Sequence, residues 1–175
     1  MKLVALLLFL PTLFVSGQNE FPTGWVGSYS GDMMIANANV PVDTARVDFE
    51  FVELIEDSVW TYKMTFHSER YGEIVKDYVI RANTSGDKQN FILDELNGIF
   101  MELTLLDGKL YGMYEVMGYM YTVSMRKLGD DLMYELFGSP MGDPLVSVAK
   151  EGKEEIEAKS HKPTVAQSAL LKKND

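Results

Sequence analysis

Apolar and polar residues alternate with a period of two along most of the chain between Trp25 and Val146, and almost no segment has helical spacing. In the run from 59 to 67, apolar residues occupy every second position starting at Trp60, while Thr, Lys, Thr and His lie between them. This period is that of a β-strand with one apolar and one polar face. Comparable runs predict nine strands, which begin near Trp25, Ala45, Val59, Ile74, Asn90, Ile99, Lys109, Tyr119 and Leu132.

The connections between these runs are short and carry Gly, Asp or Asn, which predicts hairpins between consecutive strands. Two-residue turns at Asp107-Gly108 and Met117-Gly118 would pair Leu105 with Leu110, Leu103 with Gly112, and Tyr114 with Tyr121. The strand that follows adds Tyr134 and Leu136 to the same apolar face. We therefore predict an all-β fold, an antiparallel up-and-down meander of about eight to ten strands closed as a barrel.

The N-terminal seventeen residues have the pattern of a secretory signal peptide. Lys2 precedes an apolar run from Leu3 to Val15, which is interrupted by Pro11 and followed by a polar segment. A membrane-spanning helix needs about 20 apolar residues, so this run is too short for an anchor. Small residues at positions 15 and 17 predict cleavage near Gly17, which would leave a secreted or periplasmic protein.

The remaining chain divides by composition into a β-barrel domain, residues 18–148, and a C-terminal segment, residues 149–175. This segment contains six Lys and five acidic residues and no aromatic residue. Such a composition predicts a charged, flexible tail. An alternative is a short helix from Thr164 to Leu171, whose apolar residues would cover part of the barrel.

Charge and missing residue types narrow the possible functions. Residues 18–147 contain 9 Lys and Arg against 21 Asp and Glu, which argues against nucleic acid as a partner. Charged residues such as Arg46, Asp48 and Lys63 on the outer face of the strands argue against membrane insertion. With no Cys, only two His and no phosphate-binding loop, the sequence predicts no metal, no cofactor and no assembled catalytic site. The only charges that the register turns inward are Lys76 and Glu53.

The predicted interior is apolar but rich in phenols, which need hydrogen-bond partners when they are buried. We therefore predict a cavity for a small hydrophobic molecule, with phenols orienting its polar end. The predicted lining residues are Tyr29, Trp60, Tyr62, Tyr78, Tyr114, Tyr121 and Tyr134. The alternative is a packed barrel that binds a protein partner through an outer apolar face. That face contains Tyr111, Met113, Met117, Met120 and Met133.

The segment Gly24-Trp25-Val26-Gly27 resembles the start of the first strand in lipocalin-like proteins of the calycin group. Those proteins have a Gly-x-Trp motif and a basic residue late in the barrel that packs over the Trp. Here Gly24 directly precedes Trp25, and Arg126 is the candidate for the basic residue. The resemblance implies an up-and-down barrel that holds a small apolar ligand.

Overall fold

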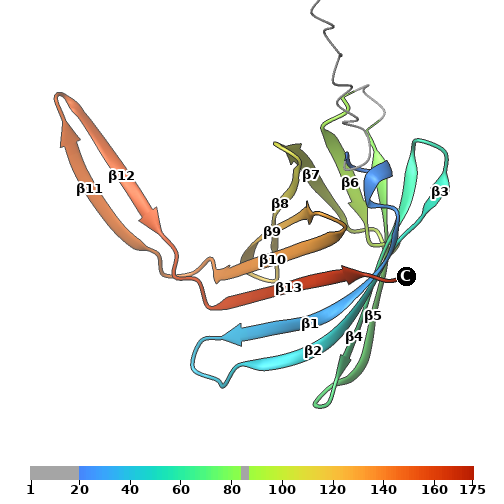
Figure 1. Ribbon diagram of the computed structural model, residues 1–175. Helices are drawn as coiled ribbons and strands as arrows, with labels where there is room; N and C mark the ends of the chain where they lie inside the picture. The colour runs from blue at the N-terminus through green and yellow to red at the C-terminus, as the bar shows by residue number, and fades with distance from the viewer. Residues whose placement is uncertain (1–19, 84–86) are drawn as a thin grey trace, which may run out of the picture.

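The computed structural model describes residues 20–83 and 87–175 and consists almost entirely of antiparallel strands (Figure 1). A single 3-10 turn, η1 (Thr23–Trp25), precedes them. The strands are β1 (Gly27–Asn37), β2 (Asp43–Phe51), β3 (Glu53–Ile55), β4 (Val59–Ser68), β5 (Gly72–Ala82), β6 (Asn90–Asp94), β7 (Phe100–Leu106), β8 (Lys109–Val116), β9 (Tyr119–Leu128), β10 (Asp131–Pro140), β11 (Leu145–Glu151), β12 (Glu154–Ser160) and β13 (Val165–Lys173). The predicted signal peptide lies outside the described residues.

Ten of these strands form a closed antiparallel barrel, which confirms the predicted fold class. The sheet runs in the order β2-β1-β13-β10-β9-β8-β7-β6-β5-β4, and pairing of β2 with β4 closes it. The short strand β3 continues β2 after Val52 and pairs with the start of β4. No helix within the described ranges has the length and hydrophobicity needed to span a membrane.

The predicted register of the β7–β8 and β8–β9 hairpins is also confirmed. Leu105 pairs with Leu110, and Tyr114 pairs with Tyr121. Both turns have two central residues with positive φ, 48° and 69° at Asp107-Gly108 and 51° and 79° at Met117-Gly118. These angles are those of type I′ turns, whose twist matches that of the flanking strands.

The predicted flexible tail is wrong for its last part, because β13 is a barrel strand between β1 and β10. Leu171 is fully buried and Ala169 is 3% exposed, so this segment contributes to the core. The alternative of a covering helix is wrong as well, since the segment pairs through its backbone on both sides. The inward positions of this segment, at every second residue from Val165, are Val, Gln, Ala, Leu and Lys. Only Val165 and Leu171 among them are large and apolar, so the two-residue period is weak.

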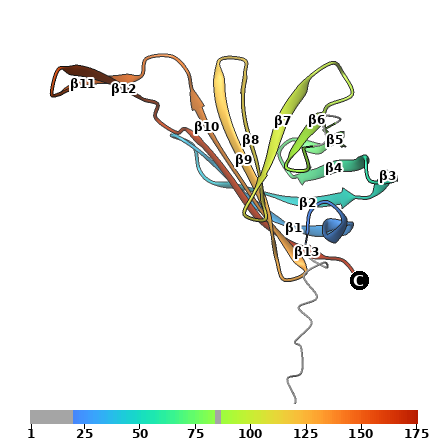
Figure 2. The same cartoon turned by 90° about the horizontal axis from the view of Figure 1, so that it is seen from above.

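Strands β11 and β12 form a separate two-stranded sheet between β10 and β13. In both views this hairpin extends away from the barrel (Figures 1 and 2). All residues of β11 and β12 are exposed. Residues 145–160 therefore neither form part of the barrel nor cover it.

The two ends of the barrel differ. At one end, which we call the plugged end, Trp25 of η1 and Phe21 just before η1 pack against the core, with their rings 4.8 Å apart and edge to face. There Trp60 stacks on Phe51, with a centroid distance of 6.5 Å and an interplanar angle of 4°. The other end, which we call the mouth, carries the β4–β5, β6–β7 and β8–β9 turns. The hairpin leaves the barrel at the mouth, on the left in Figure 1, and the C-terminus lies at the plugged end.

Candidate functional site

Five of the predicted lining residues converge in the barrel interior, between its middle and the mouth. Tyr62 on β4 pairs with Tyr78 on β5, and Tyr114 on β8 pairs with Tyr121 on β9. The rings of Tyr114 and Tyr121 stack with a centroid distance of 5.6 Å, and Tyr121 stacks on Tyr119 at 5.9 Å. The fifth residue, Tyr134, comes from β10. We call Tyr62, Tyr78, Tyr114, Tyr121 and Tyr134 the tyrosine cluster.

The electrostatics of the tyrosine cluster show that its members share one environment. Burial raises the pKa of Tyr134, and the hydroxyls of Tyr62 and Tyr114 raise it further. Burial likewise raises the pKa of Tyr62, with contributions from Tyr114 and Tyr78. Burial, Tyr121, Glu95 and Tyr78 together raise the pKa of Tyr114 to about 12. These phenols therefore stay neutral near pH 7 and can donate hydrogen bonds.

Four of these hydroxyls are free to bind another molecule. Within residues 20–83 and 87–175, the hydroxyls of Tyr62, Tyr114, Tyr121 and Tyr134 have no hydrogen-bond partner. All except Tyr134 are half-buried, so their rings reach the solvent-accessible part of the interior. An interior phenol without a protein partner needs water or a ligand to satisfy it. The mouth therefore combines apolar ring faces with several unpaired polar atoms.

A carboxylate that the sequence analysis did not place in the interior adjoins this cluster. Burial and then the charge and hydrogen bonding of Glu95 raise the pKa of Tyr78 to about 12. Glu95 directly follows β6, whose inward residues Phe91 and Leu93 continue to position 95 with a period of two. Extending this alternation one step past the strand would have found it. In contrast, Glu53 is exposed on β3 and accepts a hydrogen bond from the backbone of Asp57.

Lys76 lies at the rim of the mouth, on the inner face where the sequence analysis places it. It pairs with Met64, and its Nζ donates a hydrogen bond of 3.3 Å to the hydroxyl of Tyr78. The same Nζ lies 5.6 Å from the centre of the Tyr78 ring, in a cation–π contact. The mouth thus presents one positive and one negative side chain, Lys76 and Glu95, both of which interact with Tyr78.

The remaining two predicted lining residues, Tyr29 and Trp60, lie in the core of the plugged end. Tyr29 is fully buried, and its hydroxyl donates a 2.8 Å hydrogen bond to the carbonyl of Trp25. Trp60 is 2% exposed and packs on Phe51. The structure therefore separates them from the tyrosine cluster. The sequence analysis could not separate them, because the position of η1 across one end of the barrel has no signature in the strand pattern.

Among the described residues, the cation–π contact late in the barrel is made by Lys127 with Tyr29, and not by Arg126 with Trp25. Arg126 is exposed, whereas Lys127 turns inward and its Nζ lies 5.2 Å from the centre of the Tyr29 ring. The same Nζ donates hydrogen bonds to the hydroxyl of Tyr29, at 3.3 Å, and to the carbonyl of Asp130, at 2.6 Å. This contact closes the plugged end beside η1.

The structure also contains a cavity of about 180 Å³ near the C-terminus, where β1, β2 and β4 meet. Its lining is largely polar and includes Ser28, Asp48, Glu50, Lys63 and Asn174. It is smaller than the sites of roughly 300 Å³ or more that hold drug-sized ligands. Its size and its charged lining make it a poor candidate for a hydrophobic ligand.

The predicted outer apolar face is exposed on β8 and at the β8–β9 turn. Met117 is 95% exposed, Met113 67% and Tyr111 37%, whereas Met120 and Met133 are half-buried. Because the hairpin of β11 and β12 extends away from the barrel, it does not cover this face. The face stays available for a partner outside the chain.

Comparisons with known proteins identify the fold but no family. The sequence matches no family profile and no curated protein. The S-type phycobiliprotein lyase CPES from Guillardia theta has a similar structure, with a TM-score of 0.60, 10% identity, and coverage of 86% of this chain and 88% of that protein. Rv2717c from M. tuberculosis is also similar, with a TM-score of 0.53, 12% identity, and coverage of 86% and 93%. Both are ten-stranded antiparallel barrels of the lipocalin-like, calycin-type fold, which this chain shares.

Proposed function

We propose that the mouth of the barrel binds a small hydrophobic molecule that carries a polar group. The observation behind this proposal is the tyrosine cluster, where five phenols gather in one half-buried space and four have no hydrogen-bond partner among the described residues. Barrel mouths that combine apolar walls with a few convergent polar groups are common sites for small molecules. The fold shared with other lipocalin-like barrels is consistent with this role.

The chemistry of the mouth favours non-covalent binding. The stacked rings of Tyr114, Tyr121 and Tyr119 offer a flat apolar wall to a planar or aliphatic ligand. Neutral phenols donate hydrogen bonds to carbonyl, ether or hydroxyl oxygens of the ligand. Glu95 acts on both Tyr114 and Tyr78, and Lys76 contacts Tyr78, so each can attract a polar group of opposite charge.

Replacing Tyr114 and Tyr121 with Trp is expected to weaken ligand binding, because two larger rings fill more of the barrel interior in front of β8 and β9. We expect at least about a tenfold loss of affinity for an anilinonaphthalene dye, measured by fluorescence titration. Native mass spectrometry of the wild-type protein, with organic extraction, should identify any molecule that co-purifies with it.

Tyr111→Trp is the matched control, since Tyr111 lies on the same strand but on the outer face, where it is 37% exposed. This variant should keep the wild-type dye affinity. Equal losses in both variants, or no dye binding by the wild-type protein, would contradict binding in the mouth.

We further propose that the chain is exported and that residues 1–17 are removed. The support is the sequence alone, a basic start followed by a short apolar run and small residues at positions 15 and 17. Expression of the full chain in a secreting host, followed by N-terminal sequencing, should give a protein that starts at Gln18. A retained N-terminus would contradict export by this segment.

A further inference from the structure

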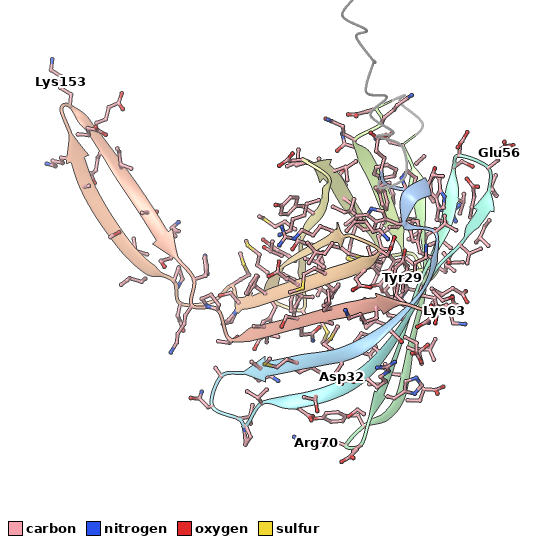
Figure 3. The ribbon with its side chains drawn as sticks, in the orientation of Figure 1. Tyr29, Asp32, Glu56, Lys63, Arg70 and Lys153 are labelled. Atoms are coloured by element: carbon pink, nitrogen blue, oxygen red, sulfur yellow. The ribbon has the colours of Figure 1, made fainter. Side chains whose placement is uncertain are left out.

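The hairpin of β11 and β12 is exposed along its whole length. All fourteen residues of its two strands are exposed, including Leu145 at 73%, Val148 at 54% and Ile156 at 45%. Lys153 marks its tip, far from the barrel (Figure 3). A two-stranded ribbon is at best marginally stable alone in water, and its unpaired edges readily accept another strand. The hairpin therefore has the properties of a strand-pairing surface.

The charges along β12 and on the two residues that follow it, His161 and Lys162, show which strand fits this edge. The segment from 154 to 162 reads Glu-Glu-Ile-Glu-Ala-Lys-Ser-His-Lys. Its acidic residues all precede Ala158, and its basic residues all follow it. When such a segment pairs antiparallel with a copy of itself, the acidic half of each strand lies opposite the basic half of the other.

We propose that β12 pairs with β12 of a second copy of this chain, antiparallel, about a two-fold axis at Ala158. In this register Glu157 stands opposite Lys159 of the second copy, and Glu154 opposite Lys162. Ile156 stands opposite Ser160, and the two Ala158 residues face each other. The result is a four-stranded sheet. Its order is β11 and β12 of one copy, followed by β12 and β11 of the second copy.

Neighbouring registers on the same edge place like charges together. A two-fold axis at Glu157 would place the two copies of this carboxylate opposite each other. An axis at Ile156 would place Glu155 opposite Glu157 twice, and an axis at Lys159 would oppose two ammonium groups. Directly opposed like charges destabilise a strand pair, while opposite charges stabilise it. The axis at Ala158 is the one of these four without a like-charge pair.

Contacts within one copy are compatible with this pairing. In the single chain, Lys159 Nζ lies 3.0 Å from Glu157 Oε1, and both side chains are more than half exposed. An ion pair this exposed contributes little, so both groups can turn to the second copy at small cost. Because the hairpin extends away from the barrel, pairing through it also keeps the two acidic barrels apart (Figure 2).

Charge reversal tests this proposal directly. A basic variant carries Glu154→Lys, Glu155→Lys and Glu157→Lys, and an acidic variant carries Lys159→Glu, His161→Glu and Lys162→Glu. In sedimentation velocity at low salt, we expect the wild-type chain to dimerise and each variant alone to bind itself at least about tenfold more weakly. An equimolar mixture of the two variants should dimerise again, and high salt should weaken the wild-type dimer.

The matched control for the basic variant is Glu56→Lys, Glu69→Lys, Glu102→Lys, which makes the same charge change at exposed sites outside the hairpin. It should dimerise like the wild-type chain. Dimers lost on Met113→Ser, Met117→Ser but kept in both charge variants would place the interface on the outer face of β8 and overturn the proposal. A monomer at all concentrations tested would overturn it too.

A cysteine scan tests the register, because the chain contains no Cys. Under mild oxidation, Ala158→Cys should form a disulfide-linked dimer, since the two residues face each other across the axis. Ser147→Cys is the control, because Ser147 pairs with Ala158 within the hairpin but lies on the other edge. Cross-linking through position 147 and not through position 158 would assign the interface to β11 and contradict the proposal.

Discussion

Deletion of residues 164–175 is expected to prevent the chain from folding into a stable barrel. The deletion removes β13, which pairs with β1 on one side and with β10 on the other. Both neighbours would then have unpaired backbone edges, and the core would lose Ala169 and Leu171. Circular dichroism with thermal melting should show no cooperative transition in the truncated chain.

Replacing the hairpin with a short turn provides the matched control for this deletion. A variant that joins Gly142 to Lys162 through a Gly-rich turn removes more residues than the truncation does. Because β11 and β12 pair only with each other among the described residues, the barrel should keep its melting temperature. A cooperative melt in the truncated chain, at the wild-type temperature, would show that β13 is dispensable.

Single substitutions in β13 measure the same contribution without removing the strand. Leu171 is fully buried, so Leu171→Ala should lower the free energy of unfolding by about 2–5 kcal/mol. Leu170, its neighbour, is 41% exposed on the outer face, and Leu170→Ala should change stability by about 0.5 kcal/mol or less. Chemical denaturation of both variants tests whether side chains alternate across β13 as the structure shows.

The nine strands β1, β2 and β4 to β10 could be predicted because most have regular alternation and turns with Gly or Asp, as at Asp107-Gly108. β13 could not be predicted, because Ala, Gln and Ser occupy much of it and have little apolar surface. Its position is determined by barrel closure, since β1 and β10 each need a partner along their free edge. That requirement depends on the number and tilt of all the strands and not on the local sequence.

The candidate site, like the fold, could be predicted only in part. The register placed Tyr62, Tyr114 and Tyr134 on one inner face, and the structure brings them together. It could not tell which end of the barrel is plugged, so it included Tyr29 with them. Glu95 was missed because it lies one residue past the end of β6, where the expected strand pattern had already ended.

Stability is expected to fall steeply above pH 10 because of the tyrosine cluster. Burial and neighbouring groups hold the pKa of Tyr78 and Tyr114 at about 12, against 10.0 for an unperturbed phenol. The pKa values of the more buried Tyr62 and Tyr134 are also raised. Below pH 10 these phenols are neutral in both states and do not make stability depend on pH. Above pH 10 the unfolded chain loses protons that the folded chain keeps, so rising pH favours unfolding.

The expected loss follows from the number of phenols involved. Above pH 10, a phenol that ionises in the unfolded chain but stays protonated in the folded chain lowers the free energy of unfolding by about 1.4 kcal/mol per pH unit. Tyr62 and Tyr134 together should therefore remove about 3–5 kcal/mol between pH 10 and pH 12. Urea denaturation at a series of pH values measures this loss.

The double variant Tyr62→Phe, Tyr134→Phe isolates the contribution of these two phenols from that of other groups that titrate above pH 10. Phe has no proton to lose, so the pH dependence of the variant should be shallower than that of the wild-type chain by up to about 3 kcal/mol per pH unit. Equal slopes in the two proteins would mean that these hydroxyls have the same pKa in the folded chain as in the unfolded chain. They would then be surrounded by water and not by the apolar wall that the proposed ligand site requires.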